Sequence, residues 1–456
     1  MQFKFFLCCL WVESENKKIY IVNTLLKKTL YWNCGLALTW FLLFYPGFYS
    51  TDSFSAIGNA SSGKWLVPGA SEWNFFVKIL SFNGLFPQIV VIIQALIFNF
   101  ALTILTFELF NNKRLAQRTS VILCLTPTVG AMGITLWRDI PFTAGLMLIC
   151  AYIVRMVNKT SVSNLGSWLL LLIGTVCLTF KQSGLPTMVV FNILLFLTFG
   201  KRIVNTKTLF PVFIALIATL QLLLYNTSDK TLVKSYAVEW MFSDISCFAS
   251  VVDGKKFQRV LGLDTSSQGE WASKEACTFL NRSNKSNERN GFLVSQIPSL
   301  WTKIVKQDPQ LILDSHYSRN SYLIPPPFGR LAQIPFIHTN IEFADRGINW
   351  LFPETTEIFR NYPRAWNWFP LRSILAWSGL WLLIILIFAI GKTDDLRGIK
   401  VVFLMALSIS IILFVSAPIP DARYALFTII AGQLIVLFKL LSFMEKKLNS
   451  RKQKRD

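Results

Sequence analysis

Six charged residues stand at or beside the ends of long apolar segments, where a membrane protein could carry out chemistry. They are Asp52, Arg138, Asp139, Lys181, Asp421 and Arg423. Arginine and lysine bind phosphate groups, and a carboxylate can accept the proton of a hydroxyl nucleophile. Together these residues could bind an anionic headgroup and still keep one carboxylate as a general base.

Each of these residues also has a structural interpretation. Asp52 could cap a short surface helix that starts directly after it. Arg138 and Asp139 could neutralise each other at a helix start marked by Pro141. Lys181 could be a snorkelling anchor at the membrane surface. The residue types and spacing leave both interpretations open.

The composition indicates that the elements positioning these residues lie in a membrane. Hydrophobic residues make up 53% and charged residues 15% of the 456 residues, whereas soluble domains carry about 25% charged residues. This excludes a cytosolic enzyme and a disordered chain. A helix needs about 20 apolar residues to cross a bilayer. Ten stretches without Asp, Glu, Lys or Arg are candidate spans: 29–51, 79–107, 119–137, 140–154, 160–180, 182–200, 208–228, 373–391, 401–420 and 424–438.

The distribution of Lys and Arg predicts the orientation of these spans. With the N-terminus inside, the inner segments hold 23 Lys and Arg and the short outer loops hold five. Positive residues favour the cytoplasmic side, so both termini are predicted to be cytoplasmic. The net charge of +20 then reflects loops and a tail that attract anionic lipid, and no nucleic-acid partner is predicted.

The predicted fold is an all-α polytopic membrane protein with about ten transmembrane helices and one large, mixed extracytoplasmic loop domain. Residues 1–228 form an N-terminal transmembrane module, 229–372 an outer cap, and 373–456 a C-terminal transmembrane module with a basic tail. Within the cap, Asp308 followed by Pro309 predicts a helix start. Cys247 and Cys277 are the two cysteines of the cap and are candidates for a disulfide on the oxidising side of the membrane.

Four motifs, in this order and on one predicted side, resemble those of bacterial GT-C-type membrane glycosyltransferases. The motifs are Tyr45-Pro46-Gly47 followed by Asp52-Ser53, Arg138-Asp139-Ile140-Pro141-Phe142, Trp301 followed by Asp308-Pro309, and Asp421-Ala422-Arg423-Tyr424. The resemblance covers most of the chain. It includes the serotype-converting O-antigen glucosyltransferases and, more distantly, aminoarabinose and protein mannosyltransferases.

The resemblance implies an extracytoplasmic site in a bacterial inner membrane that uses a sugar on polyprenyl phosphate, such as undecaprenyl phosphate. The expected sugar is a hexose such as glucose, and the acceptor is a lipid-linked or surface glycan such as O-antigen. Asp52 matches the catalytic base and Asp139 a second-loop acid. The remaining roles are donor-phosphate binding for Arg138, Lys181 and Arg423, and acceptor binding or support for Glu72, His316, Asp421 and Tyr424.

Two departures from this pattern limit what it implies. Glu72-Trp73-Asn74 stands where many relatives continue with a His-Pro segment. The first outer loop also has no D-x-D pattern, so no tightly bound metal or other cofactor is predicted, although a divalent cation is compatible with the site. Two other functions stay open: an O-antigen polymerase or ligase, and a lipid or polysaccharide transporter or flippase. A transporter favours charges at the bilayer midplane, and the candidate spans carry none.

Overall fold

The structure is a computed structural model that describes residues 17–63, 71–158, 165–203, 239–268, 296–328, 349–366, 368, 371–391, 395–416 and 422–453. Every regular element in this part of the chain is a helix, and the one extended contact is an isolated bridge between Phe48 and Thr135. The prediction of an all-α protein is confirmed for these residues.

Among the described residues, four helical segments are long and apolar enough to cross a membrane. They are α5 (Pro87–Leu109), α8 (Asp139–Val157), α22 (Leu396–Ser416) and the segment Arg423–Arg451, which contains most of α23 (Leu426–Gln453). Shorter apolar helices include α9 (Leu165–Thr179), α10 (Gly184–Ile203) and α21 (Ser378–Ile390). The number of ten spans stays a prediction, and candidate span 208–228 lies outside the described residues.

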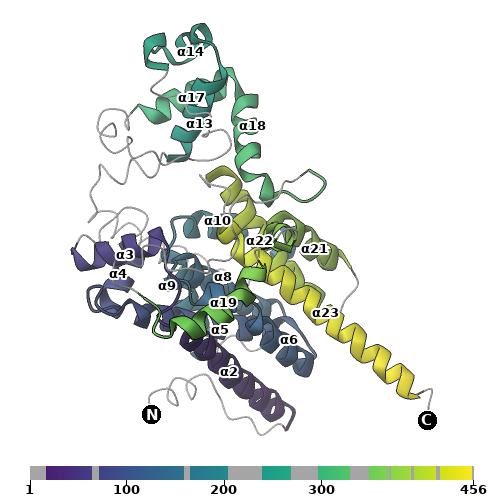
Figure 1. Ribbon diagram of the computed structural model, residues 1–456. Coiled ribbons are helices and arrows are strands. Elements are labelled where there is room, and N and C mark those ends of the chain that lie inside the picture. Colours follow the sequence, from purple (N-terminus) through teal and green to yellow (C-terminus); the bar gives the residue numbers. More distant parts are fainter. Residues whose placement is uncertain are drawn as a thin grey trace.

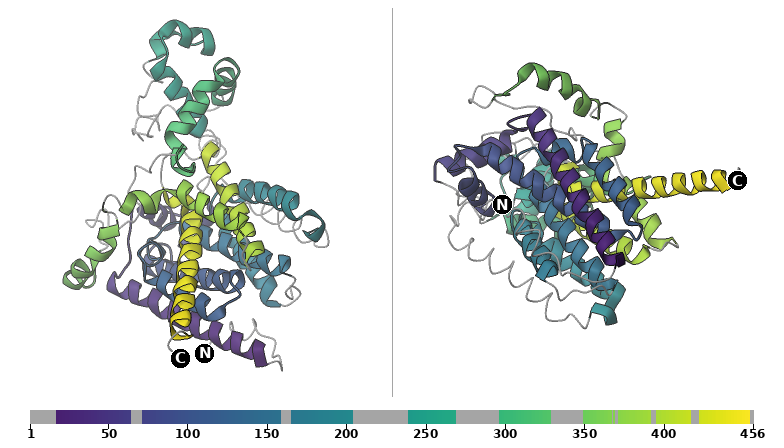
Figure 2. Two further views of the ribbon diagram at one scale, coloured as in Figure 1. Left: turned by 90° about the vertical axis from the view of Figure 1, so that its right-hand side faces the viewer. Right: turned by 90° about the horizontal axis from the view of Figure 1, so that it is seen from below.

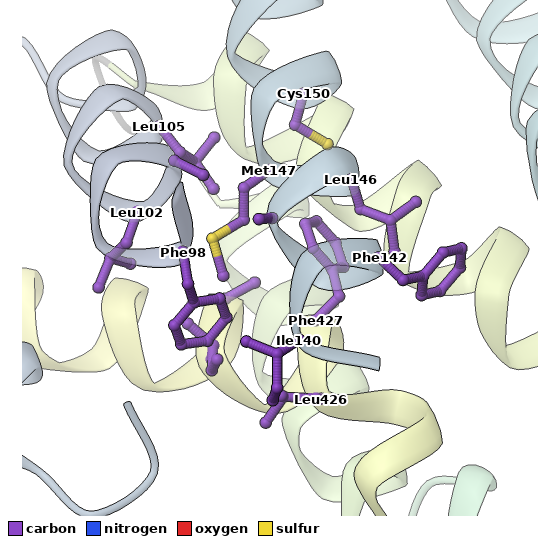
Figure 3. Close-up of a cluster of buried hydrophobic side chains, with 14 of the residues drawn as sticks. Phe98, Leu102, Leu105, Ile140, Phe142, Leu146, Met147, Cys150, Leu426 and Phe427 are labelled. Atoms are coloured by element: carbon purple, nitrogen blue, oxygen red, sulfur yellow. The ribbon is translucent and has the colours of Figure 1, made fainter. Parts of the chain in front are cut away.

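Helix α8 is the centre of the membrane body. Nearly all of its side chains are buried, because it packs against α5, α9, α22 and α23. Figure 3 shows its apolar residues meeting those of α5 and α23, with Met147 of α8 beside Phe98 and Leu105 of α5. Two glycines let α8 approach α9 closely: a Cβ on Gly145 would lie 2.7 Å from the carbonyl oxygen of Gly174. Small residues at such contacts are typical of helix packing in membranes.

The candidate span 119–137 is not one continuous helix, which corrects the prediction. Helix α6 (Lys113–Leu125) ends before Pro127, and only the short α7 (Gly130–Gly133) follows before residue 137. Proline disfavours a helical conformation of the residue before it and cannot donate a backbone hydrogen bond. The non-helical backbone finds buried partners, since the N–H of Leu136 donates to the Phe48 carbonyl at 3.0 Å. Irregular backbone at membrane depth requires such partners.

The described part of the cap is helical. It consists of α13 (Glu239–Val251), α14 (Gly254–Leu261), η2 (Thr265–Ser267), α17 (Ile297–Gln307) and α18 (Pro309–Asn320), followed by η4 (Ser321–Leu323). These helices enclose an apolar cluster of their own, in which Phe248, Phe257 and Ile304 are fully buried. Asp308 is the N-cap of α18 and accepts from the Leu311 N–H, so the predicted helix start is confirmed.

The cap lies at one end of the membrane body in both side views (Figure 1, Figure 2). Helix α2 (Lys17–Leu43) begins, and α23 ends, at the opposite end of the body (Figure 1). Helix α19 (Pro353–Trp366), which the sequence assigned to the cap, contacts the body: Thr356 Oγ1 donates to the Leu43 carbonyl at 3.0 Å. The two remaining helices before α5 are α3 (Thr51–Ser61) and α4 (Ser71–Leu80), and α20 (Leu371–Ala376) precedes α21.

Candidate functional site

Asp52 lies in the first turn of α3, directly after the chain leaves α2. Ser50, not Asp52, is the N-cap of this helix, and its backbone N–H donates to Ser53 Oγ at 2.9 Å. The structural interpretation of Asp52 as a cap is therefore wrong. In the structure, 44% of the Asp52 side chain is exposed.

Arg423 pairs with Asp52 across 371 positions of sequence. Arg423 Nη2 lies 2.7 Å from Asp52 Oδ2, and only 13% of the arginine side chain is exposed. The guanidinium also lies 4.8 Å from the centre of the Trp137 ring. Trp137 is itself fixed, because its Nε1–H donates to Ser50 Oγ at 2.6 Å. Arg423 lies in η6 (Ala422–Ala425), just before α23, so three separate segments of the chain build this part of the site.

Lys181 and Asp139 form a second, buried pair. Lys181 Nζ lies 2.5 Å from Asp139 Oδ1, with 8% and 5% of the side chains exposed. Lys181 occupies the turn between α9 and α10, and Asp139 opens α8, where the helix dipole favours an acid. Burial lowers the pKa of Lys181, and the Asp139 carboxylate opposes that shift.

Tyr424 joins the two pairs. Lys181 Nζ lies 4.2 Å and Arg423 Cζ 5.3 Å from the centre of the Tyr424 ring. An aromatic face attracts cations without neutralising them. The ring therefore keeps both cations at the site while leaving their charge available to an anion.

Arg138 and Glu72 complete the charged group. Arg138 precedes α8, and it interacts electrostatically with Asp139 and with Glu72 in the first turn of α4. Burial raises the pKa of the Glu72 carboxyl, and the nearby Arg138 partly offsets that shift. The structure thus gathers Asp52, Glu72, Arg138, Asp139, Lys181, Arg423 and Tyr424.

His316 belongs to a different polar cluster, which links the cap to the body. Its Nε2 lies 3.0 Å from Asp244 Oδ2, and its Nδ1 lies 3.0 Å from the Phe414 carbonyl at the end of α22. Asp244 also accepts from Trp301 Nε1 and Ser315 Oγ. These contacts of His316 connect the cap with the end of α22, and its predicted role beside the acceptor stays a prediction.

Two predicted residues fall outside the described part of the chain: Asp421 and Cys277. Cys247 on α13 is disulfide-bonded, whereas Cys34, Cys124, Cys150 and Cys177 are free thiols. Pairing of Cys247 with Cys277 stays a prediction. The described residues contain no group of three His, Cys, Asp or Glu that could hold a metal ion.

Three residues that shape these clusters were not among the predicted site residues: Ser50, Trp137 and Asp244. Trp137 contacts Arg423, which is far away in the sequence, so no local signal identifies it. Asp244 is the one acid of α13 after its first residue, and it is fully buried. An acid among the apolar residues in the interior of a helix is the signal that could have identified it.

The fold and its apolar helices define an all-α membrane protein with a charged site where several helices begin and end. Comparisons with protein-family profiles, curated proteins and solved structures give no match to this chain. The charged site itself is therefore the basis for a proposed function.

Proposed function

We propose that the protein is a membrane glycosyltransferase that moves a sugar from polyprenyl phosphate to a glycan at the extracytoplasmic face. The observation that carries this proposal is the joint presence of three cations and a solvent-accessible carboxylate, Asp52, at one group of helix ends. Cations suit the phosphate of the donor, and the exposed carboxylate suits the hydroxyl of the acceptor.

In this mechanism Arg138, Lys181 and Arg423 hold the donor phosphate while the lipid tail lies among the helices. Asp52 takes the proton of the acceptor hydroxyl, whose oxygen forms a bond to the anomeric carbon. The bond from that carbon to the phosphate oxygen breaks, and its electron pair leaves with the polyprenyl phosphate. The three cations stabilise the growing negative charge. A single displacement of this kind inverts the anomeric configuration.

Burial of Lys181 supports its place in this mechanism. A cation held at 8% exposure beside Asp139 acts in surroundings where water screens charges weakly, so its attraction for a phosphate is stronger than at an open surface. An ammonium that is anchored by one carboxylate also does not need to reorganise when the leaving group gains charge.

The test is transfer in a host that makes undecaprenyl-phosphate-linked glucose and a defined surface glycan. Mass spectrometry of the glycan is expected to show a single hexose increment with the wild-type chain. Asp52→Asn is expected to lower the rate of that transfer about 10²- to 10⁴-fold. Asp314→Asn, an exposed position on α18 of the cap, serves as the matched control and should transfer like the wild type.

Three outcomes would overturn parts of the proposal. Full transfer by Asp52→Asn would exclude Asp52 as the base. Addition of whole oligosaccharide repeats would instead indicate a polymerase or ligase. Movement of labelled lipid across vesicles without a new covalent bond would indicate a transporter or flippase.

A further inference from the structure

We infer that Arg423 acts as a switch by exchanging its partner: it binds Asp52 when the donor is absent and the donor phosphate when the donor is present. Donor binding would then release Asp52 to act as the base. This inference rests on the proposed function, because it concerns the same donor and the same carboxylate. It goes further by assigning an order to the steps.

The two partners of the ion pair differ in how firmly they are held. Arg423 is 13% exposed, whereas Asp52 is 44% exposed. The guanidinium lies against two rings, at 4.8 Å from Trp137 and 5.3 Å from Tyr424. Asp52 is a short side chain in the first turn of α3, and Ser50 makes the cap of that helix. The carboxylate can therefore leave while the guanidinium stays in place.

A carboxylate and a phosphate present similar oxygens to a guanidinium, which binds either through the same pair of N–H groups. The face of Arg423 that holds Asp52 at 2.7 Å is accordingly the face that a phosphate would use. Lys181 is in a different situation. Its carboxylate partner is 5% exposed and is buried with it, so that pair does not open to solvent in the same way.

The exchange explains how one cluster can hold both a phosphate-binding cation and a base. A carboxylate in a close ion pair is a weak proton acceptor, because its charge is stabilised by the cation. Once the phosphate takes Arg423, the Asp52 carboxylate loses that stabilisation and can accept the hydroxyl proton. The base is therefore active only when a donor is in the site.

The measurement is the affinity of the purified full chain in lipid nanodiscs for undecaprenyl phosphate, the product-side lipid, at pH 8. Asp52→Asn is expected to tighten binding about threefold to thirtyfold, since it removes the internal competitor for Arg423. Arg423→Gln is expected to weaken binding. The decisive comparison is the double variant, in which Asp52→Asn should bring no further gain in the Arg423→Gln background.

Asp314→Asn is the matched control, because it removes one negative charge from an exposed position on α18, outside the charged group. It is expected to change the affinity less than twofold. Equal tightening by Asp314→Asn, or tightening by Asp52→Asn that persists without Arg423, would show a general charge effect and overturn the switch. Thermal unfolding of each variant identifies those that fail to fold.

The same experiment separates the switch from the proposed function. If the wild type binds the phosphate lipid but Asp52→Asn binds it no more tightly, the switch is wrong and the donor class stands. If neither the wild type nor Asp52→Asn binds the lipid above the level of an empty nanodisc, the donor class is wrong and the switch fails with it.

Discussion

At the scale of single residues, removing either partner of the buried pair of Lys181 and Asp139 should lower stability, but by different amounts. Removing one partner of a buried pair leaves the other charge without compensation, at a cost of about 3–5 kcal/mol. Asp139→Asn should reach this range, because it leaves Lys181 buried among other cations. Lys181→Met should lower the free energy of unfolding by less, because the charges of Arg423 and Arg138 still stabilise the Asp139 carboxylate. Unfolding in mixed micelles measures both, and equal losses would contradict this account of the electrostatics.

Glu72 gives a prediction about pH. Burial raises the pKa of its carboxyl, so ionisation opposes folding at a pH above that raised pKa. This destabilisation disappears below the pKa that the Glu72 carboxyl has in the unfolded chain, about 4.3. Glu72→Gln should therefore be more stable than the wild type at pH 8, and the difference should shrink as the pH falls towards 4. Thermal midpoints across this range test the sign, which would be wrong if the advantage grew in acid.

The residue types at the site were predictable, but the pairing was not. Charge-free stretches and the bias of Lys and Arg selected Asp52, Arg138, Lys181 and Arg423 because each interrupts long apolar sequence. That Arg423 contacts Asp52, and Lys181 contacts Asp139, depends on how helices pack. Nothing in residue spacing encodes contacts over such sequence separations, and Trp137 could be linked to Arg423 only after the packing was known.

At the scale of elements, the N-cap residue of α18 gives a prediction about the local stability of the cap domain. Asp308 accepts from the Leu311 N–H and from Lys256 Nζ, the latter at 2.6 Å. Asp308→Ala should cost about 1 kcal/mol of local stability. Asp308→Asn is the matched variant, because asparagine also caps helices but cannot pair with Lys256. Hydrogen exchange of the α18 amides in the full chain should rank the wild type, Asp308→Asn and Asp308→Ala in that order, and no difference between the variants would exclude the capping role.

Asp308 also predicts how the cap responds to acid. The hydrogen bond from Lys256 lowers the pKa of Asp308, so the folded state favours the ionised form. This contribution is complete above the pKa of the unfolded chain, about 3.9, and is lost as the pH falls through the lowered value. Protection of α18 should therefore decline in acid for the wild type and remain flatter for Asp308→Ala.

The joint between cap and body depends on close backbone contact at Gly379 of α21. A Cβ there would lie 2.0 Å from the Ile324 carbonyl oxygen, which also accepts from Trp377 Nε1 at 3.2 Å. Gly379→Ala should push these segments apart and cost about 1–3 kcal/mol. Gly58→Ala is the control, since α3 leaves open space at that position. Thermal unfolding of both variants tests this prediction. If Gly379→Ala is as stable as the wild type, the close contact between α21 and Ile324 is not needed for stability.

Elements with local signals were predictable, whereas interruptions inside apolar sequence were not. Asp308 and Pro309 marked the start of α18 correctly. The stretch 119–137 counted as one span because it carries no charge, yet α6 ends at Leu125. Pro127 was visible in the sequence, but the backbone partner that makes the interruption tolerable, the Phe48 carbonyl, comes from the first outer loop and is known only from the packing.

At the scale of the whole molecule, the structure has charged pairs at both ends of the body. The end with Asp52 and Arg423 carries the cap, because the cap attaches at the end of α22 through the Phe414 carbonyl. At the other end, Arg155 pairs with Glu108 at 2.7 Å and Lys439 with Asp395 at 3.4 Å. The start of α2 and the end of α23 lie at this second end (Figure 1).

The bias of Lys and Arg predicts that this second end faces the cytoplasm. Single cysteines at exposed positions test the orientation: Thr265→Cys in the cap and Ser450→Cys near the end of α23. A thiol reagent that cannot cross membranes should label Thr265→Cys in intact cells and Ser450→Cys only after the membrane is opened, each compared with the unmodified chain. The reverse pattern would place Asp52 and its cations in the cytoplasm, and the proposed donor, whose sugar is transferred on the outer face, would then be wrong.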